Sequence, residues 1–174
     1  MSSKYELLDE CIDVGGHTLY RIRALRSFSY IKTGDLGGFV ESTWANLSHI
    51  DYCWVYDDAQ VYDGSQIRRN AQVRGTARVF GGAVVIGRAQ IYENATVSGW
   101  VEVRGDAHVY GDAHVSGKVT IAGKSHICGD AYLSAIVPDM RINTRIDHGA
   151  WTHGMILDYK NYLLSPTLEK KRIT

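Results

Sequence analysis

A hydrophobic residue recurs at every sixth position from Val55 to Leu133, and no insertion interrupts this period. Divided accordingly, residues 55–138 form 14 hexads in which the first residue is always Val, Ile or Leu and the fifth is always Ala, Ser or Val. Because side chains alternate across an extended strand, a first-position residue with outward-facing neighbours must point to the interior. The pattern predicts a succession of very short strands and no long helix in this region.

The other hexad positions indicate how these strands connect. The fifth position accepts only small side chains, which indicates a narrow interior where the chain bends. The third position is Gly in nine hexads, and Asp or Asn occur often at the third and fourth. These residues tolerate the positive φ angles of tight corners. Three hexads therefore form one triangular coil of about 18 residues, and each strand pairs in parallel with the strand one coil away. The predicted fold class is all-β, a parallel β-helix of about five coils.

The segments outside the hexads are expected to cap the two ends of the coil, because the terminal strands of a solenoid expose unpaired backbone. Residues 1–54 are predicted to form an N-terminal cap and a degenerate first coil, with Cys53 in a small inward position. Within the cap, Gly15-Gly16 is a candidate tight hairpin turn. Residues 34–39, GDLGGF, are a candidate second turn.

Residues 139–174 are predicted to form a C-terminal hairpin followed by a short helix. The apolar runs MIL and YLL, separated by four polar residues, are the candidate hairpin strands. Ser165-Pro166 provides a helix N-cap and a first-turn proline, and the helix should end at Arg172. The three segments, 1–54, 55–138 and 139–174, are expected to fold as one unit.

The charge of the chain limits the classes of partner. Lys and Arg total 19, as do Asp and Glu, so the formal net charge is zero. A protein that binds nucleic acid through phosphate contacts would carry a basic surplus, and we therefore expect no nucleic-acid partner. The N-terminal residues have no apolar signal-peptide core, and no run of 18 apolar residues occurs, so a cytoplasmic protein without a membrane partner is expected. Its cysteines, Cys11, Cys53 and Cys128, are expected to be reduced.

The unbroken period assigns each outward residue to one of three faces. The first face ends at Cys128, and its other members are expected to form a binding face: Trp54, Tyr56, Gln72, Arg74, Gln90, Tyr92, His108, Tyr110 and His126. Tyrosines, glutamines, histidines and an arginine on a rigid sheet are typical of recognition surfaces. The alternative is a solvated ladder without a partner, since aromatic residues favour strands in any case.

Two further features have more than one interpretation. On the third face, Val84 and Ile86 form a small apolar spot that could be covered by a terminal segment, lie at a subunit interface or stay exposed. His108 and His126 are one coil apart on the first face, but zinc requires three or four ligands and we identify no third one. We therefore expect neither a metal site nor a cofactor.

The segments HTLYRIRAL, GDLGGFVES, ANLSH and CWVYDDAQVY resemble a group of bacterial and prophage hexapeptide-repeat proteins, many of them labelled as acyltransferases. The resemblance covers the N-terminal cap and all the repeats. It implies a left-handed coil, which the hydrophobic period alone does not, because connections between parallel strands are generally right-handed. It also implies a phage or prophage setting in a bacterial host cell, and it assigns no catalytic residues.

Three functions are consistent with these features. The first is a non-catalytic binding or assembly scaffold, a homo-oligomer (dimer or trimer) whose aromatic face binds a protein or small-molecule partner. The second is a phage inhibitor of a host defence protein, or a trap for a small signalling molecule. The third is an acyltransferase that uses acyl-CoA, with His108 or His114 as general base. The hexads contain no projecting loop that would complete an acyl-transfer groove, and a fold alone does not define chemistry. The scaffold is therefore our first hypothesis.

Overall fold

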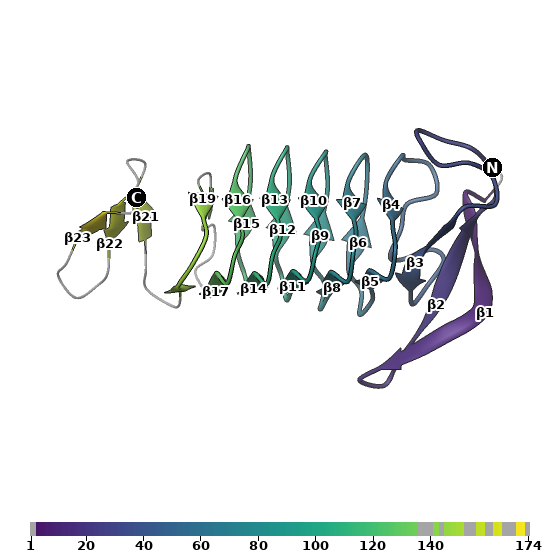
Figure 1. Ribbon diagram of the computed structural model, residues 1–174, viewed down its shortest axis with the longest axis horizontal. Coiled ribbons are helices and arrows are strands. Elements are labelled where there is room, and N and C mark those ends of the chain that lie inside the picture. The colour runs from purple at the N-terminus through teal and green to yellow at the C-terminus, as the bar shows by residue number, and fades with distance from the viewer. Residues whose placement is uncertain are drawn as a thin grey trace.

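The computed structural model describes residues 3–135, 141–142, 145–151, 156–158, 162–164 and 170–172. These residues form a parallel β-helix of about five turns, with short strands stacked along one axis (Figure 1). The predicted fold class is confirmed. The N-terminal hairpin lies at one end of the stack and extends away from the axis.

Three sheets form the sides of the coil. The first-face sheet contains β4 (Trp54–Val55), β7 (Gln72–Val73), β10 (Gln90–Ile91), β13 (His108–Val109), β16 (His126–Ile127) and β19 (Arg145–Ile146). The third-face sheet contains β6 (Gln66–Ile67), β9 (Val84–Val85), β12 (Glu102–Val103), β15 (Thr120–Ile121) and β18 (Arg141–Ile142). The second-face sheet contains β5 (Gln60–Val61), β8 (Arg78–Phe80), β11 (Thr96–Ser98), β14 (His114–Gly117), β17 (Tyr132–Ala135) and β20 (Ala150–Trp151), and it continues into the N-terminal strands.

The register between coils is the one that the hexads predict. Gln90 pairs with His108 and His108 with His126, each 18 residues further along the chain. The first-position residues, such as Val97 and Val109, are fully buried, and so are the small fifth-position residues such as Ala95. Where Ser replaces Ala at the fifth position, the interior satisfies it: the Ser65 hydroxyl lies 2.7 Å from the Tyr62 carbonyl oxygen and 2.9 Å from that of Val79.

The third hexad position adopts a positive φ in every hexad from residue 55 to residue 132, even where it is not glycine, as at Asp57, Arg69 and Glu93. At several glycines there is a second reason for the residue type. A Cβ on Gly111 would lie 2.8 Å from the nitrogen of Gly129 in the next coil. These corners stack so closely that a side-chain carbon cannot be added without a shift of the backbone.

The N-terminal cap begins with an antiparallel hairpin of β1 (Tyr5–Val14) and β2 (His17–Ala24), and β3 (Leu36–Val40) pairs with β2 and with β5. Gly15 and Gly16 both have positive φ, as a two-residue hairpin turn requires, so this predicted turn is confirmed.

The predicted second turn at 34–39 is only partly correct, because β3 starts at Leu36. Gly37 and Gly38 serve close packing and not a turn: a Cβ at Gly37 would lie 2.6 Å from Ile22, and one at Gly38 would lie 2.4 Å from the Ala59 carbonyl oxygen. The turn itself lies just before, where the Asp35 amide donates to the Lys32 carbonyl at 3.0 Å.

The first coil is closed by a buried lysine. The ammonium group of Lys4, which is 0% exposed, donates to the carbonyl oxygens of Asp51 at 3.1 Å and Cys53 at 2.9 Å. It also lies 5.1 Å from the centre of the Phe28 ring. Burial lowers the pKa of Lys4, and the neighbouring Cys53 and Asp51 oppose this effect. The lysine thus satisfies backbone carbonyls at the end of the solenoid, where no further coil is available.

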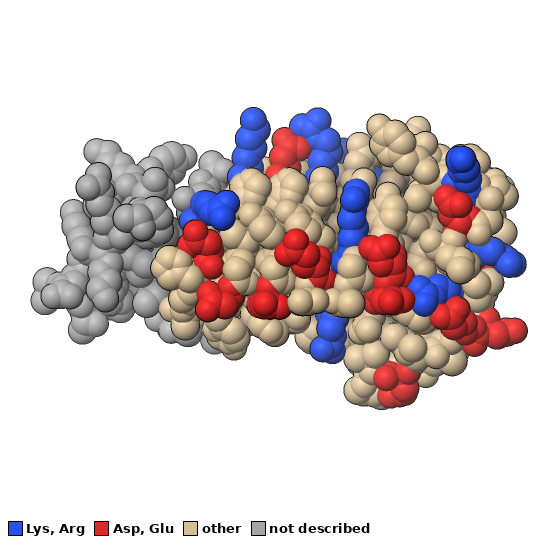
Figure 2. Space-filling view, in the orientation of Figure 1, with Lys and Arg blue, Asp and Glu red and all other residues tan. Residues whose placement is uncertain are grey.

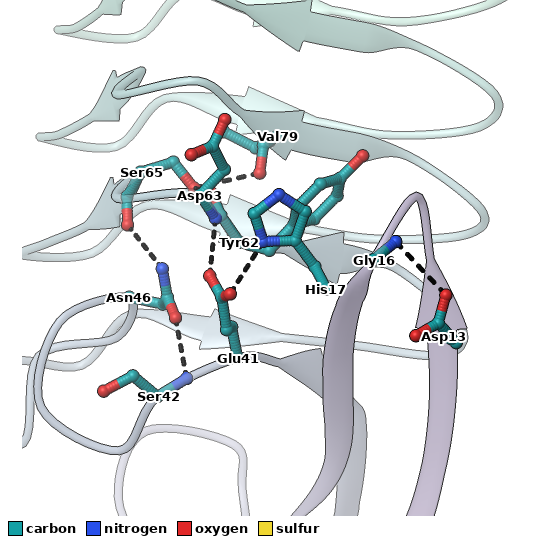
Figure 3. A network of polar contacts seen from close by, with 10 residues as sticks. All are labelled: Asp13, Gly16, His17, Glu41, Ser42, Asn46, Tyr62, Asp63, Ser65 and Val79. Atoms are coloured by element: carbon teal, nitrogen blue, oxygen red, sulfur yellow. Dashed lines mark hydrogen bonds and ion pairs between the residues drawn. The ribbon is translucent and has the colours of Figure 1, made fainter.

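A polar network fixes the tip of the hairpin to the first coil (Figure 3). His17 Nδ1 lies 2.7 Å from one carboxylate oxygen of Glu41, and the other oxygen accepts the Asp63 amide at 2.8 Å. The His17 ring also lies 5.3 Å from the ring of Tyr62. The hydrogen bond that His17 donates to Glu41 raises the pKa of His17, and the same contact lowers the pKa of Glu41.

At the C-terminal end the parallel ladder continues beyond residue 138, where the hexads end. Arg141, Arg145 and Ala150 pair with Thr120, His126 and Tyr132 at separations of 21, 19 and 18 residues. The ladder therefore continues with irregular spacing: three extra residues precede Arg141, and the intervals to Arg145 and then to Ala150 are four and five residues, so the period of six is lost.

The predicted C-terminal hairpin is present as β21 (Ile156–Asp158) and β22 (Tyr162–Leu164), but the predicted short helix is wrong at its end. Lys170–Arg172 form β23, which pairs antiparallel with β22. A helix of seven residues is unstable alone, whereas the exposed edge of β22 offers backbone hydrogen bonds directly. Residues 165–169, the start of the predicted helix, lie outside the described residues.

A matched pair of glycine variants tests the close stacking of the corners. Gly111 and Gly64 have φ angles of 73° and 71°, but a Cβ at Gly64 would meet no atom within 4 Å. We expect Gly64→Ala to cost about 1 kcal/mol from backbone strain alone. Gly111→Ala should cost about 1–3 kcal/mol more, because the next coil must move. Chemical denaturation measures both, and equal losses would contradict the stacking account.

The pH dependence of stability tests the His17–Glu41 contact. Because the folded pKa of His17 is raised, its contribution is complete below about pH 6.5 and is lost as the pH rises through the folded value. Glu41 contributes above about pH 4.5, and its share is lost as the pH falls through its lowered pKa. We expect the melting temperature to fall from pH 6 to pH 8 more steeply in the wild type than in His17→Gln. Parallel curves would show that the contact does not stabilise the folded state. Asp63 and Asp13, which also raise the pKa of His17, remain unchanged in this variant.

Candidate functional site

The first face is a flat strip with two columns of outward side chains. One column runs through Gln72, Gln90, His108 and His126, which pair strand by strand. The other column lies one inward residue further along each strand: Tyr56, Arg74, Tyr92, Tyr110 and Cys128. The parallel register holds these side chains at the spacing of the coils, so their relative positions follow from the backbone.

Four aromatic side chains at the centre of this strip form an aromatic quartet: Tyr92, Tyr110, His108 and His126. The two tyrosine rings stack with their centres 4.8 Å apart and planes 3° from parallel, and the two imidazoles stack at 4.9 Å and 7°. The two stacks stand edge to face, with 89° between Tyr92 and His108. This herringbone combines both favourable aromatic geometries and leaves the quartet half-buried.

The histidines of the quartet are held in an apolar environment. Burial and then the neighbouring His126 lower the pKa of His108, because an imidazolium would lose water and face a second positive charge. Among the described residues, the Nδ1 atoms of His108 and His126 are buried without a hydrogen-bond partner. The lowered pKa favours the neutral form of His108 at neutral pH.

Arg74 provides the positive charge of the first face at the N-terminal side of the quartet. Its guanidinium lies 4.9 Å from the centre of the Tyr56 ring and contacts the amide oxygen of Gln72. Within the described part of the chain, no carboxylate lies within ion-pair distance of it. The guanidinium is instead stabilised by the cation–π contact with Tyr56.

One member of the predicted binding face is not available for binding. Trp54 is fully buried, although its position in the register is outward. Its ring packs edge-on against Phe28 at 5.4 Å and Tyr5 at 6.2 Å. The reason is that the N-terminal cap covers the first coil on this side, which the hexad pattern cannot reveal.

Cys128 at the other end of the strip is buried too, and not open to solvent as its outward position suggests. The pKa of the Tyr110 hydroxyl is raised, mainly by its hydrogen bond with Cys128 and to a lesser extent by burial. The exposed part of the first face therefore extends from Tyr56 to His126, and eight of the nine predicted residues belong to it.

The second face is partly covered by the N-terminal hairpin. Tyr62 is buried under the hairpin with Leu19 and Phe39, and it stacks on Phe80 at 5.0 Å. Its hydroxyl accepts a hydrogen bond from Arg78 at 2.9 Å. These aromatic residues hold the N-terminal cap on the coil. They occupy outward positions of the period, as the aromatic residues of the first face do, so the sequence alone could not distinguish the two sets.

Val84 and Ile86 on the third face are half-buried. They lie between the coil that carries Gln66 and the coil that carries Glu102, with which Val84 pairs. The two side chains thus form a small, partly exposed apolar surface, and its use as a subunit interface remains a prediction.

Charged side chains are distributed along the solenoid. Acidic side chains form a row along the long axis, with isolated basic side chains above and below it (Figure 2). Several carboxylates of the solenoid have local partners: Glu93 accepts the Gly111 amide at 2.8 Å, and Asp106 pairs with Arg88 at 2.6 Å. In the described ranges, no three His, Cys, Asp or Glu side chains are placed to hold a metal ion together. Nor does any helix in those ranges have the length and apolarity to cross a membrane.

Comparison with known proteins does not extend the assignment beyond the fold. No protein-family model matches the chain, and no curated protein matches it. The class that the structure defines is that of the parallel β-solenoids, in agreement with a hexapeptide-repeat β-helix.

Proposed function

We propose that this protein is a non-catalytic binding and assembly scaffold, and that its first face makes the principal contact with a partner protein or a sister subunit. The observation that carries the proposal is the aromatic quartet, flanked by the cation of Arg74. Four rings and a guanidinium stand in one fixed register on an open strip.

The physical argument is one of preorganisation. Ordering flexible side chains at an interface costs about 0.5–1.5 kcal/mol each. Here the stacked rings are already ordered by their neighbours, so less of this cost arises on association. Tyrosine and arginine are also the residue types that most often dominate binding energy.

Acyl transfer is supported less well. A catalytic imidazole needs an acceptor that orients its second nitrogen, whereas Nδ1 of His108 is buried without a partner among the described residues. His114 is exposed on the second face, and its ring contact is with Tyr132 at 6.1 Å. Neither histidine is part of a nucleophile–base arrangement in the described part of the chain.

The resemblance to prophage proteins motivates a more specific form of the proposal: a phage-encoded scaffold acting in the bacterial cytoplasm, where the first face would block a host protein. A trap for a small signalling molecule is the alternative within the binding class. Both forms use the same surface.

A double substitution in the quartet tests whether this face mediates self-association. We expect the wild type to have a molar mass above the 19.4 kDa of one chain in light scattering. Tyr92→Ser with Tyr110→Ser should weaken association by more than about 2 kcal/mol, roughly thirtyfold in the dissociation constant. The β-helix should still form, because both rings point outward, and the loss of their stacking should lower the melting temperature by only a few degrees.

The matched control replaces two exposed aromatic residues elsewhere, Trp100→Ser with Tyr132→Ser. This variant should keep the wild-type mass. If both double variants dissociate to the same extent, or if the control alone does, the first face has no special role in assembly. A wild type that stays at 19.4 kDa at all concentrations would exclude the sister subunit as partner.

A further inference from the structure

A second candidate site lies at the N-terminal end of the third face, separate from the aromatic quartet. The loop between β3 and β4 forms one side of an open pocket of about 350 Å³, and β6 with the residue after it forms the other. The lining residues are Trp44, Ala45, Ser48, His49, Ile50 and Asp51 from the loop, with Ile67 and Arg68 from the coil.

The loop side of this pocket presents apolar surface that no described residue covers. Trp44 is 80% exposed and Ile50 is 71% exposed. Six of the eight large apolar side chains that are exposed in the described residues lie between Leu25 and Tyr52, so this end of the molecule is unusual. Exposed apolar surface next to a pocket is typical of a binding site.

His49 holds this wall in place. Its ring stacks on Tyr5 with centres 4.3 Å apart and lies 4.7 Å from the Trp44 ring. Nδ1 accepts the Lys4 amide at 3.1 Å, so Nε2 carries the proton and donates to the Thr43 carbonyl at 2.6 Å. Burial lowers the pKa of His49, and the charges of Lys4 and Arg26 add to this effect. The Trp44 ring therefore packs against a neutral imidazole whose two nitrogens both form hydrogen bonds.

The opposite side of the pocket carries a cation, Arg68, that has no ion-pair partner among the described residues. Arg68 and Arg104 occupy the same column of the third face, two coils apart. Arg104 lies 3.5 Å from the carboxylate of Glu102, whereas Arg68 has the neutral Gln66 at the equivalent position and contacts its amide oxygen. Asp51, the one carboxylate of the lining, accepts the backbone amide of Arg69 at 2.9 Å and forms no ion pair with Arg68 within the described residues.

We propose that this pocket binds a planar apolar molecule that carries an anionic group, such as an aryl carboxylate. The ring packs against Trp44 and Ile50, and the anion pairs with the Arg68 guanidinium. A wall of aromatic surface favours a flat ligand, and the missing counter-charge favours a negative one. This site does not depend on the function proposed for the first face.

Calorimetry with two probe molecules of the same shape tests the proposal. 2-Naphthoate should bind saturably, and 2-naphthalenemethanol, which lacks the charge, should bind more weakly. Arg68→Gln should weaken 2-naphthoate binding roughly tenfold, the loss expected for a charge-assisted hydrogen bond, and leave the alcohol unchanged. Trp44→Ala should weaken both probes.

The structure supplies matched controls. Arg104→Gln removes a charge from the same column away from the pocket, and Trp100→Ala removes an exposed indole elsewhere; neither should change binding of either probe. No saturable binding of 2-naphthoate to the wild type would overturn the proposal. Equal effects of Arg68→Gln and Arg104→Gln would also overturn it, because the charge effect would then be general. Arg68 and Trp44 are both exposed, and an unchanged melting temperature confirms that each variant is folded.

Discussion

The parallel hydrogen-bond ladder between successive coils is the constraint on which the rest of this structure depends. Backbone amides such as those of Gln90 and His108 donate to carbonyl oxygens in the next coil at 2.9 and 2.8 Å. Because side chains alternate across a strand, this register decides both sides of the sheet at once: Val and Ile point inward, and their neighbours point outward. A slip by one residue would expose the core and bury the outward columns. The quartet is thus a consequence of the same ladder that buries the core.

The N-terminal end of the molecule is stabilised by other contacts than the repeats are. Inside the stack, every coil is covered by the next, and simple repeats suffice. At the N-terminal end there is no next coil, so individual groups take over its functions: Lys4 donates to open carbonyls, and Phe28 and Tyr5 cover Trp54. The same end carries most of the large exposed apolar side chains of the described residues, and the pocket beside Arg68. We infer that the repetitive body supplies a rigid face, while the irregular cap supplies a shaped cavity.

The sequence predicted what depends on periodicity. The three faces, the inward positions and the first hairpin all follow from the period of six and from Gly15-Gly16, and the structure confirms them. The buried state of Trp54, Tyr62 and Cys128 could not be predicted, because it results from contacts between segments far apart in the chain. The coil beyond residue 138 was missed because three inserted residues and the two shorter intervals that follow them break the period of six. The left hand came only from the resemblance, since the hydrophobic pattern is the same for either hand.

The central functional claim is that the first face is the surface on which this protein meets its partner, and site-specific photo-crosslinking in cells tests it most directly. A photoreactive amino acid placed at Gln90, which precedes His108 by one coil in the same column, should give a discrete crosslinked species. The same group at Thr120 on the third face should give none, although both positions lie in equivalent two-residue strands. Crosslinks from Thr120 and none from Gln90 would contradict the account.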